Sequence, residues 1–362
     1  MPDFEEFVST IRELWHTRNL TNNGTFLKAF ETALEHWLGV PYVSVMTNGT
    51  LPIMLALRSL GVESGEVITT PYTFVATSGV LEWMGLRPVF ADVEEGYGTL
   101  SPSAAERLIT QRTRAILPVH VHGYPCAVDD FAELSKRYDI PVIYDAAHAF
   151  GVKSEGHSIL LHGDMATLSF HATKVFNSLE GGAVVCSSLE QKQRLDRMRN
   201  FGITGEVSVE SEGLNAKMDE MRAAYGLLNL RNIDASIRQR KHLSKVYDGA
   251  LQGVRGVRHP AIADGVEYNY AYYTLYIDAQ EYGHTRDELY LYLKEKGIHA
   301  RRYFYPLVSD FEPYKKYLKA AQSLPVASLM ASQVLCLPLY PHLSEGEIKE
   351  IAALISDFFL KI

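Results

Sequence analysis

Seven short apolar runs rich in β-prone residues alternate with helical segments between residues 43 and 187. Strands that alternate with helices need crossover connections, which produce a mostly parallel sheet. We therefore predict an α/β fold in which residues 1–235 form an N-terminal arm and a large domain with a mostly parallel seven-stranded sheet. The predicted strands are residues 43–46, 67–70, 89–93, 115–121, 142–144, 167–171 and 183–187.

The last third of the chain predicts a second unit. A basic helical segment at residues 238–243 precedes a tyrosine-rich run at residues 268–277, and helical patterns follow at residues 285–296 and 344–360. We expect residues 236–362 to form a smaller α+β domain. The tyrosine-rich run favours a strand with one face on the large domain, because aromatic residues are common in strands; a sugar-binding surface is the alternative.

Composition and charge narrow the classes of function. A formal net charge of −8 argues against general nucleic-acid binding, which needs a basic surface. The three cysteines have no paired spacing, so neither a zinc site nor a disulfide framework is indicated. The acidic N-terminal residues do not match a signal peptide, and no apolar run approaches the length of a membrane span. We expect a cytoplasmic protein without a membrane, nucleic-acid or metal partner.

A lysine and an aspartate follow two of the predicted strands. Asp145 ends the apolar run that starts at Pro141, and Lys174 lies between the run ending at His171 and the paired glycines at 181–182. Open α/β sheets bind ligands at the carboxyl ends of their strands, and a partly buried lysine can react with a carbonyl cofactor. We therefore predict that Asp145 and Lys174 are catalytic.

The turn at residues 47–50 predicts a phosphate site. It follows a short strand and precedes a run with helical spacing, in which Pro52 fits the first turn. The N–H groups of Gly49 and Thr50, together with the helix dipole, suit a phosphate. The turn, Asp145 and Lys174 thus offer partners for a phosphate, a ring nitrogen and an aldehyde. Pyridoxal 5′-phosphate carries all three groups.

Further motifs are spread over the whole chain, at residues 20–24, 47–50, 71–77, 117–120, 145–148, 169–174, 180–182, 213–220, 302–306 and 335–341. In this order they resemble the DegT/DnrJ/EryC1/StrS family of nucleotide-sugar aminotransferases. The resemblance implies the type I fold of pyridoxal-phosphate-dependent transferases. It also implies that the cofactor alternates between its pyridoxal and pyridoxamine forms, and that a homodimer shares its active sites.

The resemblance assigns roles around the cofactor ring. Lys174 matches the residue that holds the cofactor as a Schiff base and later carries a proton. Asp145 matches the partner of the ring nitrogen. Phe74 matches an aromatic residue that stacks on the ring, and His148 matches a side chain near the ring hydroxyl.

The resemblance also assigns contacts to the phosphate and the substrate. Ser169, Gly49 and Thr50 match phosphate ligands, and Asn215 matches a residue that reaches the cofactor phosphate of the neighbouring subunit. The weaker candidates for substrate contacts are Asn22, Asn23, Tyr303 and Tyr305.

The sequence His171-Ala172-Thr173-Lys174 resembles the branch that aminates C4 of a dTDP-linked 6-deoxy-4-ketosugar. We therefore expect amino transfer from L-glutamate, which leaves as 2-oxoglutarate, to dTDP-4-dehydro-6-deoxy-D-glucose. A 3-keto nucleotide sugar or a UDP-sugar is the alternative substrate.

Two other activities compete with this interpretation. His120 and His122 alternate on a predicted strand, and with His148 and Asp145 they would suit a metal-dependent hydrolase. That activity leaves Lys174 and the phosphate turn without a function. A dehydratase of the same fold has histidine in place of the lysine, so Lys174 argues against it.

Overall fold

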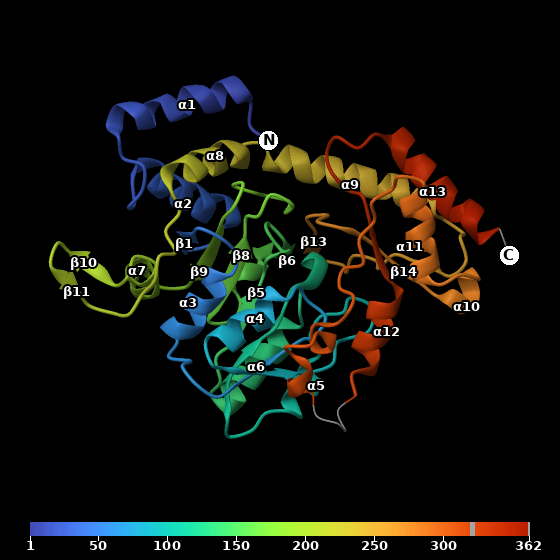
Figure 1. Ribbon diagram of the computed structural model, residues 1–362, viewed down its shortest axis with the longest axis horizontal. Coiled ribbons are helices and arrows are strands. Elements are labelled where there is room, and N and C mark those ends of the chain that lie inside the picture. The colour runs from blue at the N-terminus through green and yellow to red at the C-terminus, as the bar shows by residue number, and fades with distance from the viewer. Residues whose placement is uncertain (319–322, 361–362) are drawn as a thin grey trace.

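The computed structural model describes residues 1–318 and 323–360 (Figure 1). The strands at its centre are β1 (Tyr42–Met46), β2 (Glu66–Thr69), β3 (Arg87–Phe90), β4 (Thr113–Leu117), β5 (Ile143–Asp145), β8 (Met165–Ser169) and β9 (Gly182–Cys186). Parallel bridges from Ile116 to Val142 and from Val119 to Asp145 join two groups of strands into one sheet. The order in this sheet is β3-β2-β4-β5-β8-β9-β1.

The predicted mostly parallel seven-stranded sheet is confirmed. Pairings of β2 with β3, β2 with β4 and β5 with β8 are parallel, whereas β9 is antiparallel to both of its neighbours. The strand predicted at residues 115–121 is shorter than expected and ends at Leu117. Pro118 follows it and has no N–H to donate to a ladder.

Helices pack around this sheet (Figure 1). Helix α2 packs against α8 and β1, α1 lies along α8, and α3 packs against β8, β9 and α7. These helices are α1 (Phe4–Thr17), α2 (Thr25–Leu38), α3 (Leu51–Ser59), α4 (Ala76–Trp83), α5 (Pro102–Glu106), α6 (Val128–Tyr138), α7 (Leu189–Met198) and α8 (Glu220–Leu230).

Short elements connect the larger ones. The hairpin of β10 and β11 lies at the edge of the molecule, far from the C-terminal helices (Figure 1). The short strands are β6 (Lys153–Ser154), β7 (His157–Ser158), β10 (Ile203–Gly205), β11 (Ser208–Val209) and β13 (Val266–Glu267). The 3-10 turns are η1 (Val121–Gly123), η2 (Ile159–Leu161), η3 (Val308–Asp310) and η4 (Lys315–Tyr317).

The C-terminal part begins with α9 (Ile233–Ala250), against which the last helix packs. Its antiparallel sheet has the order β12-β14-β15, formed by β12 (Val257–Arg258), β14 (Tyr273–Ile277) and β15 (Val334–Leu337). Its other helices are α10 (Ala279–Tyr282), α11 (Arg286–Glu295), α12 (Pro325–Gln333) and α13 (Glu345–Phe359). The domain boundary predicted at residue 235 falls in the first turn of α9, and the division into two domains stays a prediction. No helix within residues 1–318 and 323–360 has the length and apolar character of a bilayer span.

The tyrosine-rich run is a strand only in its second half. Strand β14 starts at Tyr273, whereas residues 268–272 are irregular and Tyr270 has a left-handed φ of 53°. The strand predicted from residue 268 is therefore wrong for this half. The Tyr268 hydroxyl donates instead to the carbonyl of His122, so a tertiary contact outweighs the strand propensity of the aromatic residues.

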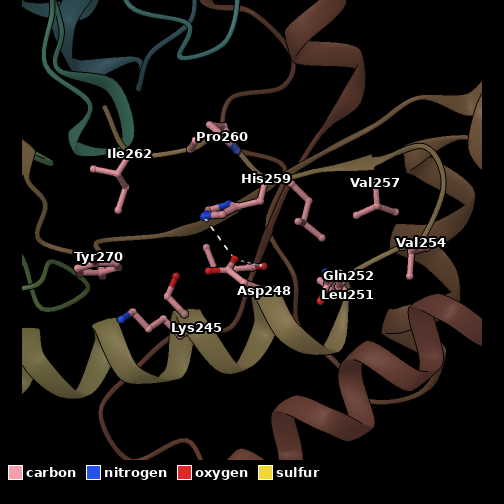
Figure 2. Close-up of a pocket in the computed structure, with 15 residues that line it drawn as sticks. Lys245, Asp248, Leu251, Gln252, Val254, Val257, His259, Pro260, Ile262 and Tyr270 are labelled. Carbon is pink, nitrogen blue, oxygen red and sulfur yellow. Dashed lines mark hydrogen bonds and ion pairs between the residues drawn. The ribbon is translucent and has the colours of Figure 1, made fainter. Parts of the chain in front are cut away.

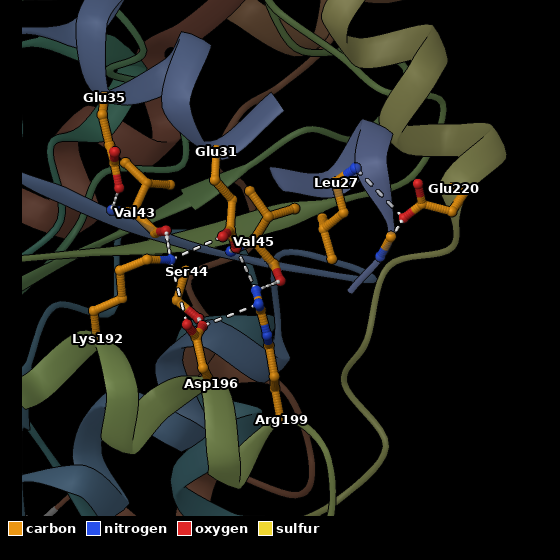
Figure 3. Close-up of polar contacts among 11 residues, drawn as sticks. Leu27, Glu31, Glu35, Val43, Ser44, Val45, Lys192, Asp196, Arg199 and Glu220 are labelled. Atoms are coloured by element: carbon orange, nitrogen blue, oxygen red, sulfur yellow. Dashed lines mark hydrogen bonds and ion pairs between the residues drawn. The ribbon is translucent and has the colours of Figure 1, made fainter. Parts of the chain in front are cut away.

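A buried ion network fixes β1 between α2 and α7 (Figure 3). The Glu31 carboxylate accepts hydrogen bonds from the Arg199 guanidinium, from the Lys192 ammonium at 2.8 Å and from the N–H of Val45 at 2.9 Å. Lys192 also donates to the carbonyl of Val43. Burial opposes ionisation of Glu31, but the two cations outweigh it and lower the pKa of the carboxyl. The network holds the strand that leads into the turn at residues 47–50.

Candidate active site

A cavity of about 270 Å³ lies where β5 and β8 end, at the carboxyl edge of the sheet. Ligands of open α/β sheets bind at this edge. Residues from distant parts of the chain line it, including these predicted site residues: Gly49, Thr50, Phe74, Asp145, His148, Ser169, Lys174 and Tyr303.

Strand register brings the phosphate turn and Ser169 together. Gly182 of β9 pairs with Met46 on one side and with Ser169 on the other, so the ends of β1 and β8 lie side by side. A Cβ atom at position 49 would lie 2.7 Å from the Oγ of Ser169. Only glycine therefore allows the turn to approach Ser169 this closely.

The start of α3 can hold an anion. The Oδ1 of Asn48 accepts the N–H groups of Thr50 and Leu51, at 2.9 and 3.0 Å. The N–H of Thr50 is therefore already used, which leaves its hydroxyl for a ligand. The N–H of Gly49 has no acceptor within residues 1–318 and 323–360. Together with the Ser169 hydroxyl, these groups form a cradle that suits a phosphate.

Asp145 is a buried acid at the end of β5. Its carboxylate accepts the Thr77 hydroxyl at 2.8 Å and the N–H of Ala147 at 3.1 Å. Burial raises the pKa of Asp145, and these two donors and the charge of Lys174 oppose that rise. Within the described ranges no cation lies within ion-pairing distance of this carboxylate. A protonated ring nitrogen would supply the missing positive charge.

Lys174 lies on the turn between β8 and β9, where its N–H donates to the carbonyl of His171. Burial lowers the pKa of Lys174 to about 8, and the nearby Asp145 partly opposes this shift. A large share of the side chain is therefore a neutral amine near pH 8. Only the neutral amine attacks an aldehyde.

His148 faces the cavity as a neutral ring. Its Nδ1 accepts the N–H of His122 at 3.1 Å, which places the ring proton on Nε2. Burial lowers the pKa of His148 well below its usual value, and the charges of Lys174 and His122 add to this. His148 can therefore donate a hydrogen bond to a ligand oxygen without carrying a charge.

The family model described as the DegT/DnrJ/EryC1/StrS aminotransferase family matches residues 3–356. The chain belongs to this family. It is 41% identical over 359 residues to the dTDP-4-amino-4,6-dideoxy-D-glucose transaminase of Shigella dysenteriae, an alignment that covers 99% of this chain and 96% of the relative. It is 33% identical to the dTDP-3-amino-3,4,6-trideoxy-alpha-D-glucose transaminase of Streptomyces venezuelae, over 90% of this chain and 84% of that protein.

A solved structure of a family relative has the same fold. The crystal structure of DesI in the presence of its TDP-sugar product matches with a TM-score of 0.94 and 31% identity, covering 100% of this chain and 91% of that chain. The predicted fold class and the predicted aminotransferase family are thus confirmed. Family membership implies pyridoxal 5′-phosphate as the cofactor, and the amine, buried acid and anion cradle of the cavity fit its three reactive groups.

Four residues predicted to contact the cofactor or the substrate do not line this cavity. Asn215 is exposed and forms a bridge with Asn200. Asn22 and Asn23 have left-handed φ angles of 65° and 63° and line a different cavity of about 380 Å³. Tyr305 is exposed beneath the guanidinium groups of two arginines, Arg286 and Arg302.

Several lining residues had no role predicted from the sequence, among them Asn48, Thr77 and Tyr272. Thr77 belongs to a motif at residues 71–77, but nothing local indicates its bond to Asp145. Asn48 is the helix-capping residue type that precedes α3, which is a usable signal. Tyr272 ends the irregular half of the tyrosine-rich run.

The alternation expected for His120 and His122 is wrong. His122 lies in η1 with a left-handed φ of 56°, so the two side chains do not share a strand face. His120 Nδ1 accepts the N–H of Cys126, and His122 Nε2 contacts the carbonyl of Tyr303. Among the residues that the structure describes, no three His, Cys, Asp or Glu side chains are grouped to hold a metal ion. This geometry removes the basis of the hydrolase alternative.

A second large cavity, of about 470 Å³, lies at the end of α9 (Figure 2). Its polar groups include Asp248, which accepts the Tyr273 hydroxyl at 2.9 Å and lies 4.0 Å from His259. None of the predicted site residues lines it. The lysine that lines it, Lys245, is exposed, whereas Lys174 is buried beside Asp145, so the cavity around Lys174 is the candidate active site.

Proposed function

We propose that this chain transfers an amino group from L-glutamate to a nucleotide-linked ketosugar, with pyridoxal 5′-phosphate as cofactor. The proposed substrate is dTDP-4-dehydro-6-deoxy-D-glucose, which would become the 4-amino sugar. The observation that carries the proposal is the joint presence of the Lys174 amine, the buried Asp145 carboxylate and the Gly49–Ser169 cradle in one cavity. The 41% identical relative from Shigella dysenteriae supports the choice of sugar.

Each of these residues would have a separate role in the amino transfer. Gly49, Thr50 and Ser169 would hold the phosphate, and Asp145 would keep the ring nitrogen protonated. When bound, the cofactor ring disperses the negative charge of the carbon that loses its proton. Lys174 would anchor the aldehyde and then carry a proton on Nζ between the two reacting carbons.

The ring would also be held from its sides. Phe74 is 57% exposed at the mouth of the cavity, which leaves its face available for stacking on a planar ring. His148 would donate its Nε2–H to the ring hydroxyl. Tyr303, which also lines the cavity, would contact the sugar.

The active site is proposed to be completed by a second copy of the chain. The cavity around Lys174 has no arginine among its lining residues, although the substrate carries a diphosphate. Asn215, Asn22 and Asn23 would then act on the partner's site, and the cavity that Asn22 and Asn23 line also has Arg197 and Lys217. The β10–β11 hairpin exposes Val207 and Val209, which fits burial against a partner.

A mixing experiment tests the shared site. Lys174→Ala and Asn215→Ala homodimers should both be inactive, because one lacks the amine and the other the proposed phosphate contact from across the interface. After subunit exchange, hybrid dimers should regain part of the activity. No recovery in hybrids of demonstrated composition would contradict the shared site. The cytoplasmic location expected from the sequence stays a prediction.

The activity itself is tested with a panel of nucleotide ketosugars and L-glutamate. NMR of the products identifies the aminated carbon, and 2-oxoglutarate is measured in parallel. Amination of C4 of the dTDP sugar supports the proposal, whereas amination at C3 would favour the alternative that the Streptomyces relative suggests. A protein that binds no cofactor and forms no 2-oxoglutarate would refute the aminotransferase activity.

A further inference from the structure

Two neighbouring residues of the C-terminal part reach across to the active-site wall. The Tyr268 hydroxyl donates to the carbonyl of His122 at 2.7 Å. The Asn269 amide donates to the carbonyls of His148 and Phe150, at 2.8 and 3.0 Å. Both side chains are buried, with exposed fractions of 6% for Tyr268 and 1% for Asn269. They therefore act as fixed contacts rather than as ligand-binding groups.

The two residues that they hold are bonded to each other at the cavity. The N–H of His122 donates to Nδ1 of His148 at 3.1 Å, and this bond selects the His148 tautomer with the proton on Nε2. Its direction depends on the backbone orientation of His122. Tyr268 fixes the carbonyl of that residue, while Asn269 fixes the carbonyl of His148. A loss of either contact would loosen the bond that selects the tautomer.

The backbone around His122 is strained and close to its neighbours. His122 has a left-handed φ of 56°, which is uncommon for a residue with a side chain. At Gly123, with φ of 97°, a Cβ atom would lie 2.9 Å from the His148 carbonyl oxygen and 3.0 Å from the Asn269 amide oxygen. Strained conformations of this kind persist only where the surroundings hold them, and they cluster at functional sites.

We propose that Tyr268 and Asn269 are positioning residues that keep His148 as a single neutral tautomer with its Nε2–H directed to an oxygen of the bound cofactor. The inference rests on the proposed function for the identity of that oxygen. It assigns a function to the irregular half of the tyrosine-rich run, which strand formation does not explain. It also makes the C-terminal part of the chain responsible for the geometry of a side chain that lies far away in the sequence.

The test compares two tyrosines that make the same kind of bond. Tyr268→Phe removes the hydroxyl that holds His122. Its matched control is Tyr282→Phe, because Tyr282 is also buried and donates its hydroxyl to a carbonyl, that of Ile355 at 2.6 Å, away from the cavity. Both variants lose one buried hydrogen bond, so a purely structural role predicts similar losses of thermal stability and nothing more.

The decisive readout is the tautomer of His148, followed by ¹⁵N NMR of the full chain labelled at histidine, with and without pyridoxal 5′-phosphate. The signal is assigned with His148→Gln. In Tyr268→Phe, both ring nitrogens should shift towards the values of exchanging tautomers, and kcat should fall about 10- to 100-fold with little change in KM. Tyr282→Phe should leave the His148 signals and kcat as in the wild type.

The inference is overturned if Tyr268→Phe gives the same His148 signals as Tyr282→Phe. If Tyr268→Phe cannot be purified, Asn269→Ser, which removes the contact to the His148 carbonyl, is read in the same way. The NMR signals of the cofactor-free chain do not depend on activity. Unchanged His148 signals in an active aminotransferase would therefore refute this inference alone. A chain that binds no cofactor would instead refute the proposed function.

Discussion

Replacement of Gly49 by alanine should open the anion cradle without unfolding the protein. The new Cβ would lie 2.7 Å from both Cβ and Oγ of Ser169 and 3.1 Å from its Cα. Non-bonded carbon atoms normally approach to about 3.5 Å, so the two segments must separate by roughly 0.8 Å. Ser169 is held in register with Gly182 on β9, so the turn at residues 47–50 has to move.

The size of the effect follows from the bonds that this movement disrupts. A shift of roughly 0.8 Å takes the Gly49 N–H and the Ser169 hydroxyl out of joint reach of one phosphate, because hydrogen bonds weaken steeply beyond about 3.2 Å. A lost bond to a charged group costs about 1.5–3 kcal/mol. The Kd for pyridoxal 5′-phosphate should therefore rise about 10- to 150-fold.

Titration of the cofactor-free protein, followed by absorbance, measures this Kd. Gly249→Ala on α9 is the matched control, because a Cβ there meets nothing within 4 Å. The control should bind the cofactor as the wild type does and gain up to about 1 kcal/mol of stability from better helix propensity. A wild-type Kd for Gly49→Ala, or an equal loss in both variants, would refute the assignment of the cradle.

Three further predictions concern buried charges. Asp145→Asn should lower kcat about 10²- to 10³-fold in a glutamate-dependent assay, because the ring nitrogen loses its acidic partner. The rate of cofactor uptake by the cofactor-free chain should rise with pH through the Lys174 pKa of about 8 and level off above that value, where the amine is neutral. A rate that does not change with pH would contradict the lowered pKa of the buried amine. Glu31→Gln should lower the free energy of unfolding by about 1.5–3 kcal/mol, because Arg199 and Lys192 lose one of their two carboxylate partners and keep only Asp196. Glu63→Gln, at an exposed pair, should cost at most about 1 kcal/mol. Because the folded pKa of Glu31 is lowered, this contribution is complete above the ordinary carboxyl pKa and is lost as the pH falls through the lower value.

The carboxyl edge of the sheet was predictable because its signals are local. Asp145 ends an apolar run and Gly49 precedes a helix with proline in its first turn, so each could be placed at a strand end without a tertiary structure. Parallel strands bring such ends together. The structure adds the detail that Gly182 aligns with both Met46 and Ser169.

Contacts between distant segments were not predictable from one sequence. The bond from Thr77 to Asp145 spans 68 residues, and no local pattern indicates it. The left-handed backbone of His122 could not be predicted either, because histidine adopts this conformation more often than most residues but still only rarely. The aromatic propensity at Tyr268 pointed to a strand, but its hydrogen bond to His122 fixes an irregular conformation. Local propensity was decisive only where no long-range contact competed with it.

The placement of Lys174 differs physically from that of its partners. Asp145 and Ser169 occupy the last positions of strands, where ladder bonds limit their movement. Lys174 lies on the irregular turn after β8, where a bond to the His171 carbonyl holds its backbone. In the proposed reaction the acid and the phosphate ligands keep one position throughout, whereas the lysine first holds the cofactor and then carries a proton to another carbon. Rigid strand ends suit the first group, whereas the flexible four-carbon stem of the lysine lets its amine reach both positions from a backbone that stays in place.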